Sequence, residues 1–176
     1  DLNQVKPKFQ KLYSKIAEEV AKMSHAKRLQ VGAVIVKDDR VISMGYNGMP
    51  AGWENNCEDK EWCSAGGWVD PETIEELWPY EGTYTDQQGN TIHGRYRLRT
   101  KPEVLHAESN AIAKLAKSND SGDGADLFVT HSPCMECSKL IFQSGIRRVY
   151  YTENYRDDSG IKFLKQSGIE VIKHDE

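Results

Sequence analysis

A histidine, a glutamate and two cysteines stand at two short, fixed spacings in this chain. Residues 106–108 read His-Ala-Glu, and residues 133–137 read Pro-Cys-Met-Glu-Cys. One imidazole, two thiols and a nearby carboxylate are the groups that a catalytic zinc site needs: three protein ligands leave the fourth position for water, and a base stands beside it. The chain must therefore fold so that these two segments meet.

The first segment is predicted to start a helix. Residues 103–117 carry apolar side chains at helical spacing. His106 and Glu108 fall in the first turn, about 200° apart around the axis at ~100° per residue. One side chain is thus able to hold the metal while the other passes beside it toward a substrate.

The second segment is predicted to start another helix, which Pro133 opens and which ends near Ser144. Cys134 and Cys137 lie three residues apart on one face of it. They stand at its N-terminal end, where the helix dipole favours the thiolate that binds zinc. Two alternatives remain: a structural zinc, which normally takes a fourth protein ligand, and a helix-capping His106 with merely buried thiols.

The order of the remaining elements predicts one α/β domain over residues 1–176. Its mixed five-stranded sheet carries helices on both faces, in three layers. Predicted helices cover residues 8–24, 103–117, 133–144 and 159–166, and predicted strands cover 31–36, 40–44, 126–130, 148–151 and 169–172, with a turn at 38–39.

Residues 51–102 do not follow this succession of predicted helices and strands, and they contain all four Trp residues. A structureless loop of about fifty residues is improbable in a compact domain. We therefore predict an insertion with a small core of its own, placed between the second strand and the metal-binding helix.

Composition narrows the class of protein. The formal charge of −4 argues against a nonspecific binder of polyanions. No apolar run approaches the ~20 residues of a membrane span, and no signal-peptide pattern is present. Four cysteines without an export signal favour metal ligation in a reducing cytoplasm over disulfides.

Several further motifs carry a resemblance to a known family. Together with the metal motif, the chain resembles the phage-type deoxycytidylate (dCMP) deaminases of the zinc-dependent cytidine and deoxycytidylate deaminase superfamily. The motifs are Val-Gly-Ala-Val-Ile-Val-Lys at 31–37, Gly-Tyr-Asn-Gly at 45–48, His-Ala-Glu-Ser-Asn-Ala-Ile at 106–112, Ser-Pro-Cys-Met-Glu-Cys-Ser-Lys at 132–139 and Gln-Ser-Gly-Ile at 143–146.

The resemblance implies hydrolysis of dCMP to dUMP and ammonia, feeding dTMP synthesis in the cytoplasm, which is the host cytoplasm for a phage enzyme. Zinc would be held by His106, Cys134 and Cys137, with Glu108 as the catalytic acid and base. It also implies a homohexamer that dCTP activates and dTTP inhibits. The alternative is a deaminase of the same superfamily that acts on bases in tRNA or single-stranded DNA, which would need a basic groove and aromatic stacking surfaces.

Three residues are candidates for contacts with the nucleotide. Asn47 matches the family position near the sugar, and the alternative is a turn residue with left-handed backbone geometry. Arg28, with Lys27 as second choice, is the candidate for the 5′-phosphate, and the alternative is a solvated helix end. Tyr155 matches a family aromatic near the substrate, and the alternative is an ordinary loop tyrosine.

A row of cations suggests an effector site. Arg95, Arg97 and Arg99 alternate, so on an extended segment they project from one face. Together with Tyr46 and Gly48 they are our candidates for the dCTP and dTTP site, with Mg²⁺ on the triphosphate. The alternative is a solvated strand face.

A second, structural zinc is a further hypothesis for the insertion. Cys57, Cys63 and His93, with His25 as an additional ligand, are the candidate residues. The five residues between the two cysteines match no recognised zinc finger. The alternative is buried thiols and a surface histidine.

Overall fold

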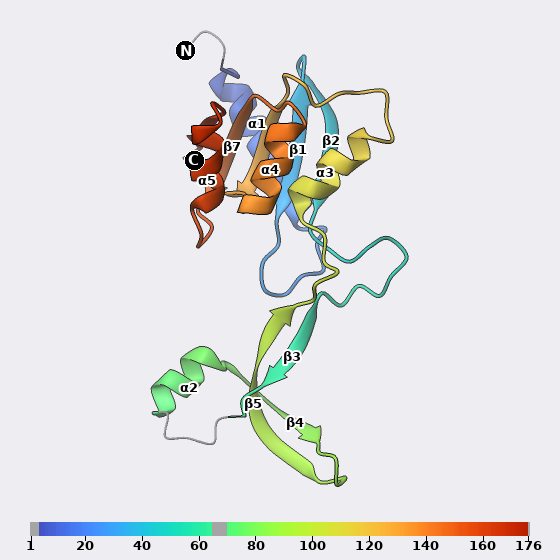
Figure 1. The fold of residues 1–176 in the computed structure, drawn as a ribbon, viewed down its shortest axis with the longest axis vertical. Coiled ribbons are helices and arrows are strands. Elements are labelled where there is room, and N and C mark those ends of the chain that lie inside the picture. The colour runs from blue at the N-terminus through green and yellow to red at the C-terminus, as the bar shows by residue number, and fades with distance from the viewer. Residues whose placement is uncertain (1–3, 65–69, 176) are drawn as a thin grey trace. The chain divides into compact units, whose positions relative to one another are not determined.

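The structure, a computed structural model, describes residues 4–64 and 70–175. Its contacts divide the chain into two compact units (Figure 1). The main unit comprises Asp1–Asn56 and Glu103–Glu176, and the second unit comprises Cys57–Pro102. The second unit lies within the segment that we predicted as an insertion. Whether the chain acts as a single domain stays a prediction.

The main unit is built on a mixed five-stranded sheet with the strand order β2-β1-β6-β7-β8. Neighbours from β2 to β6 are antiparallel, and β6, β7 and β8 are parallel. The sheet was predicted correctly from the order of elements. The strands are β1 (Gly32–Lys37), β2 (Arg40–Tyr46), β6 (Asp126–His131), β7 (Arg148–Glu153) and β8 (Glu170–Lys173).

Helices cover both faces of this sheet, as predicted (Figure 1). α1 (Pro7–Ala21) packs on one face, where Tyr13 and Ala17 join a buried cluster with alternate residues of β1 and β6. α3 (Ala107–Leu115), α4 (Met135–Gln143) and α5 (Ser159–Gln166) pack on the other face and contribute to the second buried cluster. Central strands that are covered on both sides carry apolar residues toward both faces, which explains the apolar runs at 31–36 and 127–129.

Both metal-motif helices begin later than predicted. His106 and Cys134 are N-cap residues with extended backbones, at φ −81°, ψ 153° and φ −71°, ψ 172°, and α3 and α4 start after them. The predicted first-turn positions were therefore wrong for these two ligands. The periodicity of apolar residues locates a helix, but the backbone angles of its cap decide where it begins.

The second unit contains a three-stranded antiparallel sheet in the order β3-β5-β4. Its strands are β3 (Glu58–Trp62), β4 (Tyr80–Thr85) and β5 (Thr91–Thr100), and α2 (Pro71–Leu77) is capped by Asp70, which accepts a hydrogen bond from the Thr73 amide at 3.0 Å. Among the described residues of this unit, Cys57 is the one buried apolar residue. Tilted aromatic rings lie where we predicted a small core, with the ring centroid of Trp62 at 4.7 Å from that of Tyr84 and 5.0 Å from that of Tyr96.

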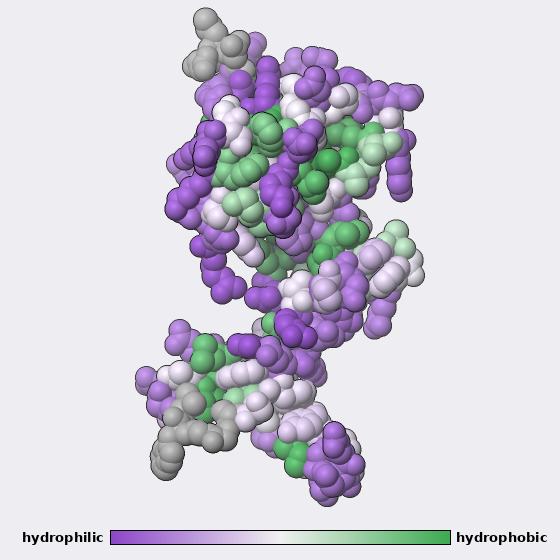
Figure 2. Space-filling view, in the orientation of Figure 1, coloured by the Kyte–Doolittle hydropathy of each residue, from purple (hydrophilic) through white to green (hydrophobic). Residues whose placement is uncertain are grey.

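The visible surface of the main unit is largely hydrophilic, with smaller apolar patches over its helices (Figure 2). In the part of the chain that the structure describes, no helix is long and apolar enough to cross a membrane.

Gly45 allows α3 to approach β2 closely. A Cβ at this position would lie 2.4 Å from the carbonyl oxygen of Ala107 and 2.6 Å from the amide nitrogen of Ala111. Both are backbone atoms of α3 and have little freedom to move away. The missing side chain at Gly45 thus sets how closely the helix that follows His106 rests on the sheet.

Gly45→Ala is expected to destabilise the protein by about 1–3 kcal/mol, because the added methyl group overpacks this contact. Gly48→Ala is the matched control, since no heavy atom lies within 4 Å of a Cβ built at Gly48. That variant should stay within about 0.5 kcal/mol of the parent protein. Urea unfolding of the three proteins measures both values, and equal stabilities would contradict the close-approach argument.

Candidate active site

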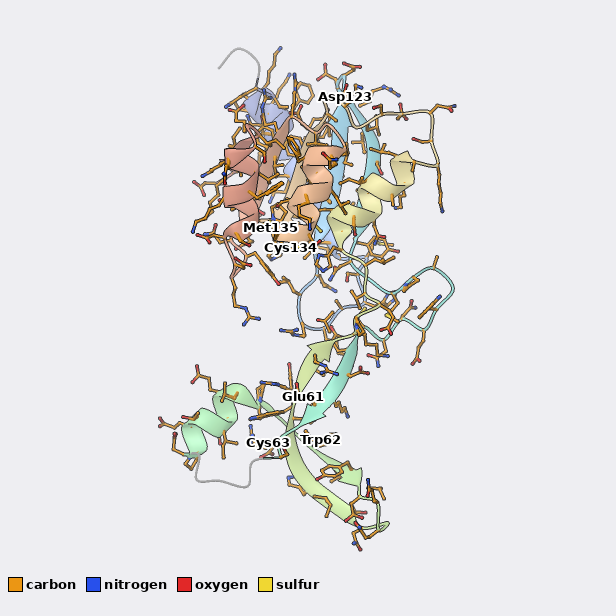
Figure 3. All side chains as sticks on the ribbon, in the orientation of Figure 1. Glu61, Trp62, Cys63, Asp123, Cys134 and Met135 are labelled. Atoms are coloured by element: carbon orange, nitrogen blue, oxygen red, sulfur yellow. The ribbon has the colours of Figure 1, made fainter. Side chains whose placement is uncertain are left out.

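The N-terminal ends of α3 and α4 meet in the main unit. His106 caps α3 without a side-chain hydrogen bond to its own helix. The Cys134 sulfur caps α4 by accepting from the amide of Cys137 at 3.5 Å. Figure 3 labels Cys134 and Met135 at this end of α4. Both helix dipoles therefore present their positive ends, which favours anionic ligands.

The three predicted ligands lie at metal-binding distances. His106 Nδ1 is 3.6 Å from Cys134 Sγ and 3.3 Å from Cys137 Sγ, and all three ligand atoms lie within 4.8 Å of one another. Zinc bonds of about 2.3 Å to sulfur and about 2.0 Å to nitrogen, at tetrahedral angles, separate a sulfur from a nitrogen by about 3.5 Å. The arrangement therefore fits zinc. Among residues 4–64 and 70–175, this is the one group of three such side chains that could hold a metal.

Within residues 4–64 and 70–175, the site supplies three ligands, and these three residues differ in exposure. Cys137 is buried, Cys134 is half-buried and His106 is exposed. A structural zinc normally takes four protein ligands. The open side and the missing fourth ligand favour a catalytic ion over a structural one.

The two thiols do not ionise equally without a cation. Hydrogen bonds, above all the one from Cys137, lower the pKa of Cys134 to about 4. The same contact with Cys134, together with burial, raises the pKa of Cys137. The hydrogen bond with Cys134 also raises the pKa of His106. The site holds one thiolate readily, and a second thiolate requires a nearby positive charge, which a divalent ion supplies.

Glu108 lies beside these ligands in the first turn of α3. The residue is 4% exposed, and burial raises the pKa of its carboxyl group. A hydrogen bond from the Cys137 thiol and the charge of His106 act in the opposite direction. A buried carboxyl group with a raised pKa is suited to exchange protons near neutral pH.

The side-chain amide of Asn47 is hydrogen-bonded to backbone atoms of the main unit. Its Oδ1 accepts from the Val31 amide at 2.8 Å, and its Nδ2 donates to the Leu29 carbonyl at 2.7 Å. The described non-glycine residues with positive φ are Asp38 and Asp39, so the left-handed alternative for Asn47 was wrong. A contact of Asn47 with a nucleotide stays a prediction.

The other predicted nucleotide contacts lie on loops of the main unit. Arg28 and Lys27 are exposed in the loop between α1 and β1. Tyr155 is 40% exposed in the loop after β7. The backbone amide of Tyr155 donates to the hydroxyl of Ser132 at 2.7 Å, which fastens this loop two residues before Cys134.

The cation row lies on β5, with its members pointing to one face as predicted, and two of them pair with neighbouring strands. Arg97 makes hydrogen bonds of 2.9 and 3.1 Å to Glu61, and Arg95 makes one of 2.9 Å to Glu81. The Arg97 guanidinium holds the pKa of Glu61 below its usual range. Arg97 also lies 4.4 Å from the Trp78 ring.

The effector-site hypothesis draws on both units. Tyr46 and Gly48 belong to the main unit, whereas Arg95, Arg97 and Arg99 belong to the second unit. Binding of an effector by these residues stays a prediction.

The prediction of a second zinc site was wrong. Cys57 and Cys63 flank β3 at opposite ends, and Cys63 lies beside the end of that strand in Figure 3. Six residues of extended chain span about 20 Å, which no single metal ion bridges. Among the described residues, the one group that could hold a metal ion does not include Cys57, Cys63, His93 or His25.

Four residues whose side chains hydrogen-bond to the backbone of other segments were not foreseen from the sequence: Asn110, Ser24, Gln30 and Ser132. Asn110 donates from Nδ2 to the Tyr46 carbonyl at 2.9 Å and so ties α3 to the end of β2. Its place four residues after His106, within the metal motif, was a usable signal. Ser24, Gln30 and Ser132 carry no such signal, because isolated polar residues in predicted loops are common.

Comparisons with known proteins agree with this site. The family model described as the cytidine and deoxycytidylate deaminase zinc-binding region matches residues 7–153. This chain belongs to that family. It is therefore an enzyme, a deaminase.

Phage proteins are among its relatives in this deaminase family. The deoxycytidylate deaminase of Enterobacteria phage T4 is 34% identical over 171 residues, covering 89% of this chain and 85% of the phage protein. The deoxycytidylate deaminase of Mycobacterium phage D29 is 35% identical over 146 residues, covering 83% and 95%. The structure of the dCMP deaminase of cyanophage S-TIM5 with dCMP and dUMP matches with a TM-score of 0.73 and 38% identity, covering 97% of this chain and all of that one.

Metal analysis is expected to find about one zinc per chain. Cys134→Ser and Cys137→Ser should each lower the zinc content to a small fraction of this value, because each removes one of three ligands. Cys57→Ser and Cys63→Ser are the matched controls and should leave it unchanged. Plasma emission spectrometry of dialysed protein measures the zinc content. About two zinc ions per chain would show that a second zinc site exists.

Proposed function

We propose that this protein hydrolyses dCMP to dUMP and ammonia with one zinc ion. The observation that carries the proposal is the triangle of His106, Cys134 and Cys137 with a buried Glu108 beside it. The solved S-TIM5 dCMP deaminase, which was determined with dCMP and dUMP, matches almost the whole chain. The formal charge of −4 favours a small nucleotide over a nucleic acid as substrate.

The chemistry follows from the residues present. His106, Cys134 and Cys137 would hold a zinc ion, which would supply Lewis acidity that activates water at neutral pH. Glu108 accepts a proton from the water that attacks C4 of the cytosine ring and passes it to N3. Glu108 then moves the remaining proton of the added hydroxyl group to the exocyclic amine, the bond from C4 to this nitrogen breaks, and ammonia leaves as the C4 carbonyl of uracil forms. Burial keeps the carboxyl group of Glu108 available for both directions of proton transfer.

The nucleotide is proposed to bind with its sugar near Asn47, its phosphate near Arg28 and its base near Tyr155. Arg28 is exposed, and a guanidinium is suited to bidentate binding of a phosphate. The amide of Asn47 is anchored by the backbone of 29–31, so its orientation is set before a nucleotide arrives.

The proposal includes the wider setting of the reaction. Production of dUMP would feed dTMP synthesis in the cytoplasm, and the enzyme would act as a homohexamer. dCTP, with Mg²⁺ on its phosphates, is proposed to activate it, and dTTP to inhibit it. The arginines of β5 are proposed to bind the effector phosphates. Two of them form ion pairs in the structure, Arg95 with Glu81 and Arg97 with Glu61. Effector phosphates would thus replace carboxylates.

Glu108→Gln is expected to lower the rate of ammonia release from dCMP by at least 10²-fold, because the amide does not shuttle protons. Its zinc content should stay at that of the parent protein. Glu136→Gln is the control, since this glutamate is exposed on α4 and pairs with Lys139. Cytidine and single-stranded oligonucleotides are assayed in parallel. Faster turnover of either than of dCMP would contradict the proposed substrate.

At subsaturating dCMP with Mg²⁺ present, dCTP is expected to raise the rate and dTTP to lower it. Glu61→Gln should reduce the dTTP concentration needed for half-inhibition, because it releases Arg97 from its carboxylate. Initial-rate measurements over a range of effector concentrations test both statements. A rate that neither nucleotide changes would contradict the regulation.

A further inference from the structure

The loop between α1 and β1 is closed by its own side chains. Gln30 Nε2 donates to the Ser24 carbonyl at 2.8 Å, which joins the two ends of the loop. The Ser24 hydroxyl accepts from the Ala26 amide at 3.1 Å and is part of a residue only 5% exposed. Residues 24–31, here called the closed loop, are therefore joined end to end by a side-chain hydrogen bond.

Asn47 fastens the closed loop at both ends. The Ser24 hydroxyl donates to the Asn47 carbonyl at 2.7 Å. At the other end, the Asn47 side chain binds the Leu29 carbonyl and the Val31 amide. One asparagine thus anchors the beginning and the end of the loop.

The same anchor connects to the metal ligands. Gly48, which follows Asn47, pairs with Leu105 through two backbone hydrogen bonds of 3.1 and 2.8 Å. Leu105 immediately precedes His106. A continuous path of covalent and hydrogen bonds therefore runs from the closed loop to the zinc-ligand histidine, and the loop stands at a set position beside the site.

The ionisable side chains of the closed loop are all basic. His25, Lys27 and Arg28 are exposed on it, and no Asp or Glu occurs between Val20 and Lys37. In a deoxyribonucleoside monophosphate, the phosphate is the group that carries negative charge, so it is the group that such a loop attracts.

We propose that Ser24 and Gln30 are positioning residues that hold the closed loop ready for the 5′-phosphate of the nucleotide. This inference rests on the proposed function. A loop that is ordered before binding loses less conformational entropy when the ligand arrives, so loosening it weakens binding of the phosphorylated ligand. The chemical step, at Glu108 and the zinc ligands, does not depend on the closure.

Gln30→Ala and Ser24→Ala test the proposal with two readouts. Each is expected to raise the KM for dCMP by about three- to tenfold, the effect of losing a side-chain hydrogen bond, while kcat stays within about twofold. The inhibition constant of deoxycytidine against dCMP should stay within about twofold, because this nucleoside has no phosphate. Gln30 is exposed, so its truncation keeps the test valid even where Ser24→Ala lowers stability.

Ser144→Ala is the matched control, since it removes a hydroxyl that donates to the Ile141 carbonyl at 2.8 Å at the C-terminal end of α4. It should change neither constant. An unchanged KM in Gln30→Ala, an equal fall in kcat, or an equal rise in the deoxycytidine inhibition constant would overturn the proposal. A parent protein that does not deaminate dCMP would instead overturn the proposed function itself.

Discussion

The proposed zinc ligands come from two segments 28 residues apart. The packing of α3 and α4 on one face of the sheet brings His106 Nδ1 to 3.6 Å from the sulfur of Cys134. That packing depends on small residues. Gly45 admits α3 against β2, and Ala107 and Ala111 of that helix are fully buried. Gly160 does the same for α5, since a Cβ there would lie 2.1 Å from the Pro133 carbonyl oxygen. The ligand distances are thus a property of the helix layer, and not of the short motifs alone.

The charges of the site explain why a cation belongs there. Two thiols and a carboxyl group share a small, partly buried volume, and each negative charge opposes the next. The opposite pKa shifts of Cys134 and Cys137 express this competition. The buried carboxyl group of Glu108 adds to it, because its charge is among the causes that raise the pKa of Cys137. A divalent ion removes the conflict, and the two helix N-termini contribute in the same direction.

The parts of the fold that sequence predicted well are those with local or repetitive signals. The runs 31–36 and 126–130 predicted the central strands, and the metal motif predicted that His106, Cys134 and Cys137 come together, although not where their helices begin. The cap residues were missed because the φ and ψ angles of one residue leave no mark on apolar periodicity. The second zinc site failed for a different reason: Cys57 and Cys63 look close in sequence, but extended backbone separates them. A spacing of six residues allows proximity where the chain turns back in a loop, but means distance along a strand.

Partners of polar side chains were the hardest features to predict, because they depend on register and on loop closure. Alternation showed that the arginines of β5 share a face, but the pairing of Glu61 with Arg97 and of Glu81 with Arg95 follows from the strand registers. Asn47 posed the same difficulty, since its two partners lie sixteen and eighteen residues earlier in the chain. The second unit carries nine acidic and five basic residues, so the whole formal charge of −4 resides there and the main unit is neutral. A phosphate approaching the main unit therefore responds to local clusters such as the closed loop, because no net field of that unit draws it elsewhere.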